Sequence, residues 1–316
     1  MLNSIKCHHP KRGVVVAGGE TDAGEGEITP AFFARSPIKI GMARAQEILG
    51  YEVVARIGEG ARSVIYAVKD KKSQVYALKH VIKNKPKDAR FLEQAVLEHQ
   101  VSSKLNHPCL RRSYKLIKQR QLLRVSEIFV LMELVDGVTL EQYVPPDLVS
   151  LCQVCDQIAD GLELMHEEGF VHADMKPNNV LVTDDGRVKI IDFGQSCRDG
   201  TVKQRIQGTP DYIAPEQVRR KMLTPRTDVF NFGATMYWLL THQHIPTMIP
   251  KGTKGIESRD IEPPPSPRAL RPEVPEALSA LVMDCVEPAV NERPESMARV
   301  RDRLDLAIRQ LQRRET

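Results

Sequence analysis

Residues 170–194 read Phe-Val-His-Ala-Asp-Met-Lys-Pro-Asn-Asn-Val-Leu-Val-Thr-Asp-Asp-Gly-Arg-Val-Lys-Ile-Ile-Asp-Phe-Gly, and this stretch decides the fold. Its short apolar runs predict brief strands, and the Asp-Asp-Gly between two of them is typical of a hairpin turn. The apolar runs are residues 170–172, 180–182 and 188–191, and the turn is residues 184–186. These short strands therefore carry a cluster of polar side chains.

The polar cluster has the composition of a magnesium and phosphate site. Asp174 and Asp192 supply two carboxylates, and Lys176, Asn178 and Asn179 lie close to Asp174 in the sequence. Mg²⁺ usually binds through one or two carboxylates together with substrate phosphates. A nearby lysine suits a phosphate that is being transferred. An isolated Asp-Gly pair is typical of a turn. Turn formation does not explain why two aspartates, a lysine and two asparagines occur together in this order.

The order of these residues resembles the catalytic loop and the metal-binding motif of eukaryotic-type protein kinases. That family has His-Arg-Asp, a lysine two residues on, an asparagine five residues on, and then Asp-Phe-Gly. The matching residues here are His172, Ala173, Asp174, Lys176, Asn179 and Asp192-Phe193-Gly194. Because Ala173 replaces the family's arginine, the chain resembles bacterial-like serine/threonine kinases of the non-RD type, which lack that arginine.

The resemblance implies an α+β, two-lobed protein kinase fold over residues 49–312. A small β-rich N-lobe with one main helix would occupy residues 49–135, and a larger, mainly helical C-lobe would occupy residues 136–312. Residues 1–48 mix glycine, proline and acidic residues without periodicity, which predicts a flexible N-terminal arm. Residues 313–316 would form a tail.

The composition is that of an ordinary globular protein. Among 316 residues, 45 basic and 41 acidic side chains give a formal charge of +4, which is too small to predict nucleic-acid binding. No apolar run reaches the ~18 residues needed to span a bilayer. No membrane span and a cytoplasmic location are therefore expected.

The six cysteines are scattered, without the density of a disulfide framework. Cys152 and Cys155 form a C-x-x-C inside a helical pattern, and no second pair or histidine follows at zinc spacing. We expect two core thiols there. Cys7-His8-His9 is at best a weak metal candidate.

A glycine turn between two strand patterns, Gly58-Glu59-Gly60, is the context of a kinase phosphate-covering loop. Lys79 follows in Tyr-Ala-Leu-Lys, which matches the Val-Ala-Ile-Lys strand whose lysine holds the α- and β-phosphates. A helix is expected over residues 88–105, and its Glu98 is the preferred partner of Lys79, with Glu93 as the alternative.

The resemblance implies a complete ATP site, in which Met132 would be the gatekeeper and the backbones of Glu133 and Val135 would bond adenine. The residues expected to bind ATP are Ile57, Gly58, Glu59, Gly60, Ser63, Ile65, Ala77, Lys79, Glu98, Met132, Glu133, Val135, Leu181 and Asp192. The expected catalytic residues are Lys79, Asp174, Lys176 and Asn179. Mg²⁺, with Mn²⁺ as the alternative ion, would bind at Asn179 and Asp192.

Further along the chain, residues 208–216 resemble the end of the kinase segment that presents protein substrates. The family pattern implies a buried pair between Glu216 and Arg293 and a bond from Asp228 to the catalytic-loop backbone. The last helix has an apolar stripe that predicts docking on the core, with dimerisation as the alternative. The stripe is Met297, Val300, Leu304, Ile308 and Leu311.

Three features depart from the family or stand apart from it. Ser63 replaces the usual third glycine of the phosphate loop, and Ser102 replaces a large apolar residue one turn after Glu98. The connector over residues 118–124 is basic, which predicts a solvated hairpin, with a docking surface for acidic partners as the alternative.

The function expected from the resemblance is transfer of the ATP γ-phosphate to serine or threonine hydroxyls of proteins, including autophosphorylation. Lys176 together with Thr209 resembles the serine/threonine-specific subgroup. Two alternatives remain: a kinase-fold scaffold with little turnover, which Ser63 and Ser102 favour, and a small-molecule kinase, which residues 208–216 disfavour. The oligomeric state and the protein substrate are not encoded in any motif.

Overall fold

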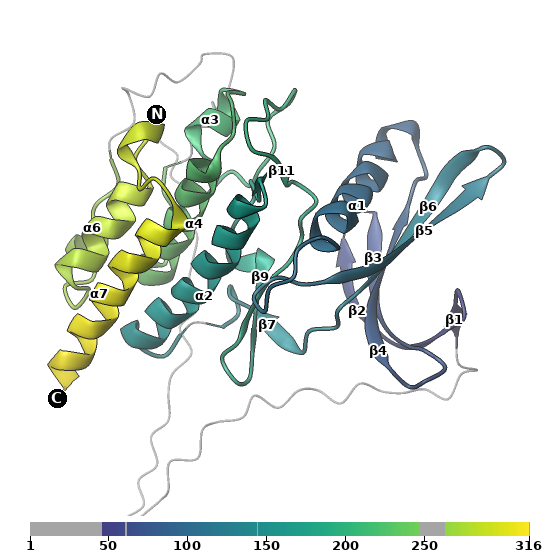
Figure 1. The fold of residues 1–316 in the computed structure, drawn as a ribbon, viewed down its shortest axis with the longest axis horizontal. Coiled ribbons are helices and arrows are strands. Elements are labelled where there is room, and N and C mark those ends of the chain that lie inside the picture. Colours follow the sequence, from purple (N-terminus) through teal and green to yellow (C-terminus); the bar gives the residue numbers. More distant parts are fainter. Residues whose placement is uncertain (1–45, 61, 144, 247–262, 316) are drawn as a thin grey trace, which may run out of the picture. The chain divides into compact units, whose positions relative to one another are not determined.

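The N-terminal part of the described chain is built on one antiparallel sheet. The computed structural model describes residues 46–60, 62–143, 145–246 and 263–315. Six strands pair in the order β1-β2-β3-β4-β6-β5 (Figure 1). They are β1 Glu47–Ile48, β2 Tyr51–Gly60, β3 Ser63–Lys69, β4 Val75–Ile82, β5 Ser113–Gln121 and β6 Arg124–Met132. The alternating, β-branched sequences of the inner strands suit a sheet that is buried on one face.

Helix α1 (Ala89–Ser102) packs on this sheet. Leu92, Ala95 and Glu98 recur at every third position and so share one face of the helix. Leu92 and Ala95 belong to the same buried cluster as Val130 and Met132 of β6. This apolar contact fixes the direction in which Glu98 points.

The C-terminal part is mainly helical and holds the largest core. Its helices are α2 Leu148–Glu167, α3 Pro215–Val218, α4 Pro225–Thr241, α5 Pro267–Leu270, α6 Glu276–Cys285 and α7 Met297–Glu315. The apolar stripe of α7 faces the core, as predicted, and packs against α2 and α6. Met297, Val300, Leu304 and Leu311 are buried, and Ile308 is partly buried against them. A β-sheet lobe and a helical lobe confirm the predicted two-lobed fold.

The stretch quoted at the outset forms the predicted strands and turn. Strands β9 (Val180–Thr183) and β10 (Val188–Ile190) pair as a hairpin, and β7 (Gly137–Thr139) flanks β9. Gly186 turns the hairpin with φ +77°, a conformation that glycine adopts without strain. Strands β8 (Phe170–Val171) and β11 (Cys197–Arg198) form a separate pair. This pairing ties the segment after Asp-Phe-Gly to the start of the catalytic loop.

Two boundaries in the N-terminal part differ from prediction. Helix α1 ends at Ser102 rather than at residue 105, because serine favours helix ends over helix interiors. The predicted connector over residues 118–124 is mostly strand, since β5 and β6 continue to pair as far as Gln121 and Arg124. Only Leu122 and Leu123 form the turn, and both are almost fully exposed.

The ends of the predicted domain lie inside regular elements. Glu47 pairs with Glu52, so the last two residues of the predicted arm belong to the sheet. Helix α7 continues to Glu315, through most of the predicted tail. Residues 1–45, with the weak metal candidate Cys7-His8-His9, lie outside the described residues.

Cys152 and Cys155 are buried within α2, as predicted for core thiols. Burial raises the pKa of the Cys152 thiol to about 12 and holds the pKa of Cys155 well above its usual value. Within the described ranges, no helix has both the length and the apolar character that crossing a bilayer requires.

Two leucines of α7 provide a matched test of its docking. Leu304 is fully buried, whereas Leu306 is 56% exposed. We expect Leu304→Ala to lower the free energy of unfolding by about 2–5 kcal/mol, because it leaves a cavity in the core. Leu306→Ala should change it by about 0.5 kcal/mol or less. Urea denaturation of both variants measures the difference, and equal losses would contradict this packing.

Candidate active site

The first element of the site is a buried ion pair between the sheet and helix α1. The Lys79 Nζ lies 2.6 Å from Glu98 Oε2. Lys79 sits on β4 between β3 and β6, and Glu98 is 1% exposed. This confirms Glu98 as the partner of Lys79, whereas the alternative, Glu93, is exposed.

A second cation binds the same carboxylate. Arg111 Nη2 lies 2.8 Å from Glu98 Oε1, and the arginine is itself buried. Each oxygen of Glu98 therefore has its own cationic donor. The sequence analysis missed Arg111, because one arginine in a loop before β5 has no motif or periodicity that would single it out.

The surroundings of this ion pair are polar where family resemblance predicts apolar packing. Ser102 is buried, and its hydroxyl donates to the Glu98 carbonyl (2.8 Å) inside α1. One turn away, His99 shares a 2.7 Å hydrogen bond with the buried Ser113 of β5. Ser102 and Ser113 thus each form a local hydrogen bond, and looser packing beside Ser102 stays a prediction.

The catalytic loop is held by Asp228 at the start of α4. Its carboxylate accepts the backbone N–H groups of His172 and Ala173 at 2.7 Å each, as predicted. His166 Nε2 lies 2.8 Å from the same carboxylate. Burial alone would raise the pKa of Asp228, but the hydrogen bond and charge of His166, the charge of His172 and the hydrogen bond from the Ala173 N–H lower it below its usual value. Ala173 has φ +60°, so these two bonds stabilise a left-handed backbone that a non-glycine residue rarely adopts.

Asp174 is the centre of a compact polar group. Thr209 Oγ1 donates to Asp174 Oδ1 at 2.9 Å, and Lys176 Nζ donates to Thr209 Oγ1 at 2.7 Å. Lys176 Nζ is also 3.3 Å from Asp174 Oδ2. Asn179, in a 3₁₀ turn at Pro177–Asn179, donates its Nδ2–H to the Asp174 carbonyl at 2.8 Å. The structure therefore brings Lys176, Asn179 and Thr209 together around Asp174.

Asp192 follows β10 in a left-handed conformation, with φ +65°. Its Oδ1 accepts the Gly194 N–H at 3.3 Å. Burial would raise the pKa of Asp192, but the positive charge of Lys79, the Gly194 hydrogen bond and Arg111 lower it below its usual value. Burial would likewise lower the pKa of Lys79, but Glu98 and Asp192 raise it. The two groups therefore stabilise each other's charged forms.

A cavity of about 180 Å³ lies beside Lys79, Asp174 and Asp192. Among the residues predicted for nucleotide binding, Ser63, Lys79 and Asp192 line it, and Asp174, which is predicted to be catalytic, lines it as well. Arg62 and Gln94 also line it and were missed, because neither matches a motif. The cavity corresponds to the phosphate end of the predicted site.

The residues predicted to contact adenine lie outside the lining of that cavity. Ala77 pairs with Met132 across β4 and β6, which places the predicted gatekeeper beside the predicted apolar wall. The Glu133 N–H donates to the Arg112 carbonyl at 2.9 Å, so only the Glu133 carbonyl is left for a ligand. Ile65 packs against the buried cluster that contains Ala77 and Met132. The other residues predicted for this part are Ile57, Val135 and Leu181.

The predicted phosphate loop is the turn between β2 and β3. Gly58 pairs with Ile65, and Gly60 pairs with Ser63, while Glu59 is exposed. A Cβ at Gly60 would come within 2.8 Å of the Ser63 hydroxyl, so a side chain there would require that hydroxyl to move. Ala61, at the tip, lies outside the described residues.

The predicted pair behind the substrate segment is also formed. Arg293 Nη1 and Nη2 lie 2.8 and 2.9 Å from the two carboxylate oxygens of Glu216, and both residues are buried. Gln217, which the sequence analysis missed, donates to the Ala173 carbonyl at 2.8 Å and to the Gln207 carbonyl at 3.2 Å. A neutral amide thus links the substrate segment to the position where the family has arginine.

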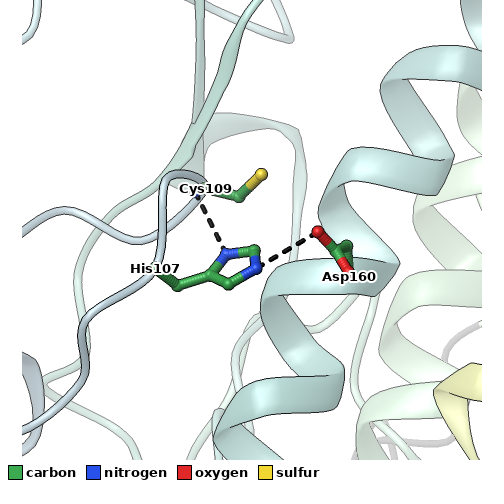
Figure 2. Close-up of side chains that lie close together, drawn as sticks. All are labelled: His107, Cys109 and Asp160. Carbon is green, nitrogen blue, oxygen red and sulfur yellow. Dashed lines mark hydrogen bonds and ion pairs between the residues drawn. The ribbon is translucent and has the colours of Figure 1, made fainter.

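One further cluster has the residue types of a metal site, but its bonding does not fit an ion. Figure 2 shows His107, Cys109 and Asp160 close together. His107 Nδ1 accepts the Cys109 backbone N–H at 3.2 Å, and Nε2 lies 3.1 Å from Asp160, so both ring nitrogens are engaged. Arg301 neutralises Asp160 at 2.6 Å, and burial raises the pKa of the Cys109 thiol to about 11. The cluster is a structural link between the loop before β5 and helix α2.

The anchoring of the catalytic loop makes a pH-dependent prediction. At about pH 7, Asp228→Asn should lower the free energy of unfolding by about 1.5–3 kcal/mol, the value of hydrogen bonds to a charged group. Because the folded pKa lies below the unfolded value of 3.8, this contribution is complete above pH 3.8 and is lost as pH falls through the folded pKa. Denaturation of the wild type and of Asp228→Asn at a series of pH values measures this contribution. The control is Asp284→Asn, because the Asp284 side chain is half-exposed. A difference that already shrinks between about pH 7 and pH 5 would contradict the lowered pKa.

Comparison with known proteins agrees with this geometry. The serine/threonine-protein kinase PknL of Mycobacterium tuberculosis is 35% identical over 202 residues, covering 60% of this chain and 49% of PknL. The probable serine/threonine-protein kinase PknB of Lactococcus lactis is 28% identical over 264 residues, covering 77% of this chain and 39% of PknB. The serine/threonine-protein kinase PrkC of Bacillus subtilis is 26% identical over 246 residues, covering 74% of this chain and 36% of PrkC.

The chain thus spans about half the length, or less, of these curated relatives. The pattern of the protein kinase domain family matches residues 51–303, which include every residue of the site described above. The chain belongs to the protein kinase domain family.

Proposed function

We propose that this chain is an ATP-dependent protein serine/threonine kinase. The observation that carries the proposal is that two polar groups are formed together in one structure. Lys79 is paired with Glu98, and Asp174 is bonded to Thr209 beside Lys176. A phosphoryl-transfer site needs the first group to hold the donor phosphates and the second to position the acceptor hydroxyl.

The residues present fit a divalent cation bound with ATP. Asn179 uses its Nδ2–H on the Asp174 carbonyl, so its Oδ1 faces away from that bond and is available as a hard oxygen ligand. The lowered pKa of Asp192 keeps its carboxylate ionised at neutral pH. We propose that Asn179 and Asp192 hold the cation, and hard oxygen ligands of this kind favour Mg²⁺, with Mn²⁺ as the alternative.

ATP, when bound, supplies the γ-phosphoryl group and the leaving diphosphate. Lys79 would neutralise charge on the α- and β-phosphates, under a loop formed by Gly58, Glu59, Gly60 and Ser63. The apolar wall for adenine would come from Ile57, Ile65, Ala77, Met132 and Leu181, with backbone bonds from Glu133 and Val135. We propose a cytoplasmic location for this domain, where ATP would be available.

Asp174 would position the acceptor hydroxyl and take its proton. Its Oδ1 accepts from Thr209, and its Oδ2 is 3.3 Å from Lys176, so the carboxylate is held from two sides. Lys176 would then neutralise charge on the transferred group. Catalysis of this kind is mainly positioning and electrostatic stabilisation. The Lys176–Thr209 bond (2.7 Å) supports serine and threonine as acceptors, in agreement with the names of the relatives.

A kinase-fold scaffold with little turnover is the second candidate. The polar surroundings of α1, with Ser102 and Ser113 buried, favour it, because hydroxyls pack less apolar surface than large side chains do. Binding of Mg²⁺ and ATP without phosphate transfer would support the scaffold function over the kinase function.

A transfer assay with γ-labelled ATP tests the catalytic proposal. The wild type should label itself or a generic basic protein on serine and threonine, and Asp174→Ala should reduce labelling by about 100-fold or more, the loss typical of removing a positioned proton acceptor. Asp184→Ala, at the exposed hairpin turn between β9 and β10, is the matched control and should label normally. Equal labelling by the two variants would contradict the role of Asp174.

The missing arginine makes a separate prediction about regulation. Ala173 removes the bidentate partner that a phosphorylated substrate segment needs. In the structure the neutral Gln217 holds that segment, and Ser196 is 2% exposed. Phosphatase treatment should therefore leave the transfer rate unchanged. If treatment abolishes activity and rephosphorylation restores it, phosphorylation of Ser196, Thr201 or Thr209 controls the enzyme and this prediction fails.

A further inference from the structure

The turn between β5 and β6 exposes two adjacent leucines, which we call the hairpin tip. Leu122 and Leu123 are 95% and 92% exposed, and no other large apolar side chain in the described part of the chain exceeds 57%. Neither leucine belongs to a buried cluster of the described residues. Strand β5 is the edge of the N-terminal sheet, and the hairpin extends beyond helix α1 at the right of Figure 1. Core packing therefore does not account for the tip.

The backbone of the tip is also unusual for leucine. Gln121 pairs with Arg124, so Leu122 and Leu123 are the two central residues of the turn. Leu122 has φ +56°. A two-residue hairpin turn with positive φ at its first central position favours glycine there, and a bulky side chain in this conformation is strained. Glycine would suit this backbone and a polar residue would suit the solvent, so folding alone does not explain a leucine here.

The strands behind the tip carry only positive charge. Residues 113–126 contain four basic and no acidic residues, and the formal charge of the whole chain is also +4, so this hairpin alone accounts for the excess. In the part of the chain that the structure describes, none of these four cations has an ion-pair partner, and Glu127, the next acidic residue along β6, pairs with His80 instead. All four side chains are exposed, and they are Lys115, Lys118, Arg120 and Arg124.

Two other hairpin turns of the protein lack this combination. Residues 70–74, which join β3 to β4, include Lys71 and Lys72 but no apolar residue, and Asp70 accepts two backbone N–H groups within that turn. The turn between β9 and β10 is built from Asp184, Asp185 and Gly186. Both contain the polar and glycine residues that turns usually contain. An apolar tip backed by cations thus distinguishes the β5–β6 hairpin from these two turns.

The spacing of the cations matches the layers of a lipid surface. A strand rises about 3.4 Å per residue, which puts Arg120 about 7 Å and Lys118 about 13 Å behind Leu122 along β5. Arg124 directly follows Leu123 on the other strand. Protein segments that lie in a membrane interface bury their apolar side chains about 5–10 Å into the boundary between headgroups and acyl chains. Leucines at that depth would leave Arg120 and Arg124 among the headgroups and Lys118 at the outer surface.

We propose that the β5–β6 hairpin docks on an anionic lipid bilayer. Leu122 and Leu123 would enter the boundary between headgroups and acyl chains. Lys118, Arg120 and Arg124 would contact the anionic headgroups, because the negative potential of such a surface attracts nearby cations. The long side chains of these residues allow the charged ends to stay in the headgroup layer while the leucines go deeper.

A lipid surface fits the tip better than an acidic protein does. Two leucines and their basic neighbours offer too little area for a stable protein interface, which buries about 1,200–2,000 Å² in total. Both leucines stand almost fully in solvent at a two-residue turn, so the tip is convex. A fluid bilayer encloses a convex tip without a preformed pocket. The inference concerns binding and not phosphate transfer, so its test and the transfer assay can fail independently.

Co-sedimentation of the full chain with lipid vesicles tests the proposal. The chain should bind vesicles of equal parts phosphatidylglycerol and phosphatidylcholine about 100-fold more tightly than pure phosphatidylcholine, because each of three cations contributes about fivefold. Sodium chloride should weaken the binding, since salt screens exposed charges. Arg120→Gln with Arg124→Gln should weaken it about 25-fold by the same reasoning. Lys71→Gln with Lys72→Gln is the matched control in the β3–β4 turn and should bind as the wild type does.

Leu122→Gly separates a binding role from a structural one. It should weaken vesicle binding about tenfold, the loss expected when one leucine side chain is no longer buried. Its midpoint of urea denaturation should not fall, because glycine adopts positive φ without strain. Leu306→Ala, which removes a half-exposed leucine of α7, is the matched control and should bind vesicles as the wild type does.

The proposal is wrong if the wild type does not bind the mixed vesicles, or if Leu122→Gly unfolds at lower urea. Binding that is lost in the arginine variant but unchanged in Leu122→Gly would show contact through charge alone, as with an acidic protein, and would also contradict it. Sedimentation velocity without lipid checks one more occupant. If the wild type is a dimer and Leu122→Gly is a monomer, the tip contacts a second copy of the chain and not a membrane.

Discussion

The site depends on one buried carboxylate, Glu98. Lys79 holds one of its oxygens at 2.6 Å and Arg111 holds the other at 2.8 Å. These contacts join three separate elements: strand β4, helix α1 and the loop before β5. A buried charge is tolerated only when it is paired and hydrogen-bonded, so the two cations fix where α1 can lie on the sheet. Through the charges of Lys79 and Arg111, the same cluster keeps Asp192 ionised.

The acceptor side of the site is organised by a second buried carboxylate, Asp228. It holds the backbone of His172 and Ala173, and Ala173 in turn receives Gln217 through its carbonyl oxygen. In this way α4, the catalytic loop and the substrate segment are connected without an arginine beside Asp174. The two carboxylates have the same physical role. Each is removed from water, and each is stabilised by donors from several elements that it thereby holds in register.

Sequence reasoning found the residues that occur in ordered motifs and missed those that act singly. Asp174, Lys79 and Glu98 were predicted, because fixed spacing and helix periodicity place them, and the hairpin between β9 and β10 was predicted from its turn residues. Arg111 and Gln217 were missed, since neither lies in a motif or in a periodic pattern that would single it out. The adenine wall stays a prediction, because its residues lie outside the lining of the cavity that contains Lys79, Asp174 and Asp192. Strand lengths at the β5–β6 hairpin were underestimated, because cross-strand pairing continues through a basic segment that looked like a loop.

The double-mutant cycle of Glu98→Gln and Arg111→Met tests the central claim most directly. The free energy of unfolding is measured for the wild type, both single variants and the double variant. If Glu98 is the shared junction, the two losses should be non-additive by about 1–3 kcal/mol, the range for residues in direct contact within one polar network. Losses that add to within about 0.5 kcal/mol would mean that Arg111 and Glu98 act independently, and would contradict the account.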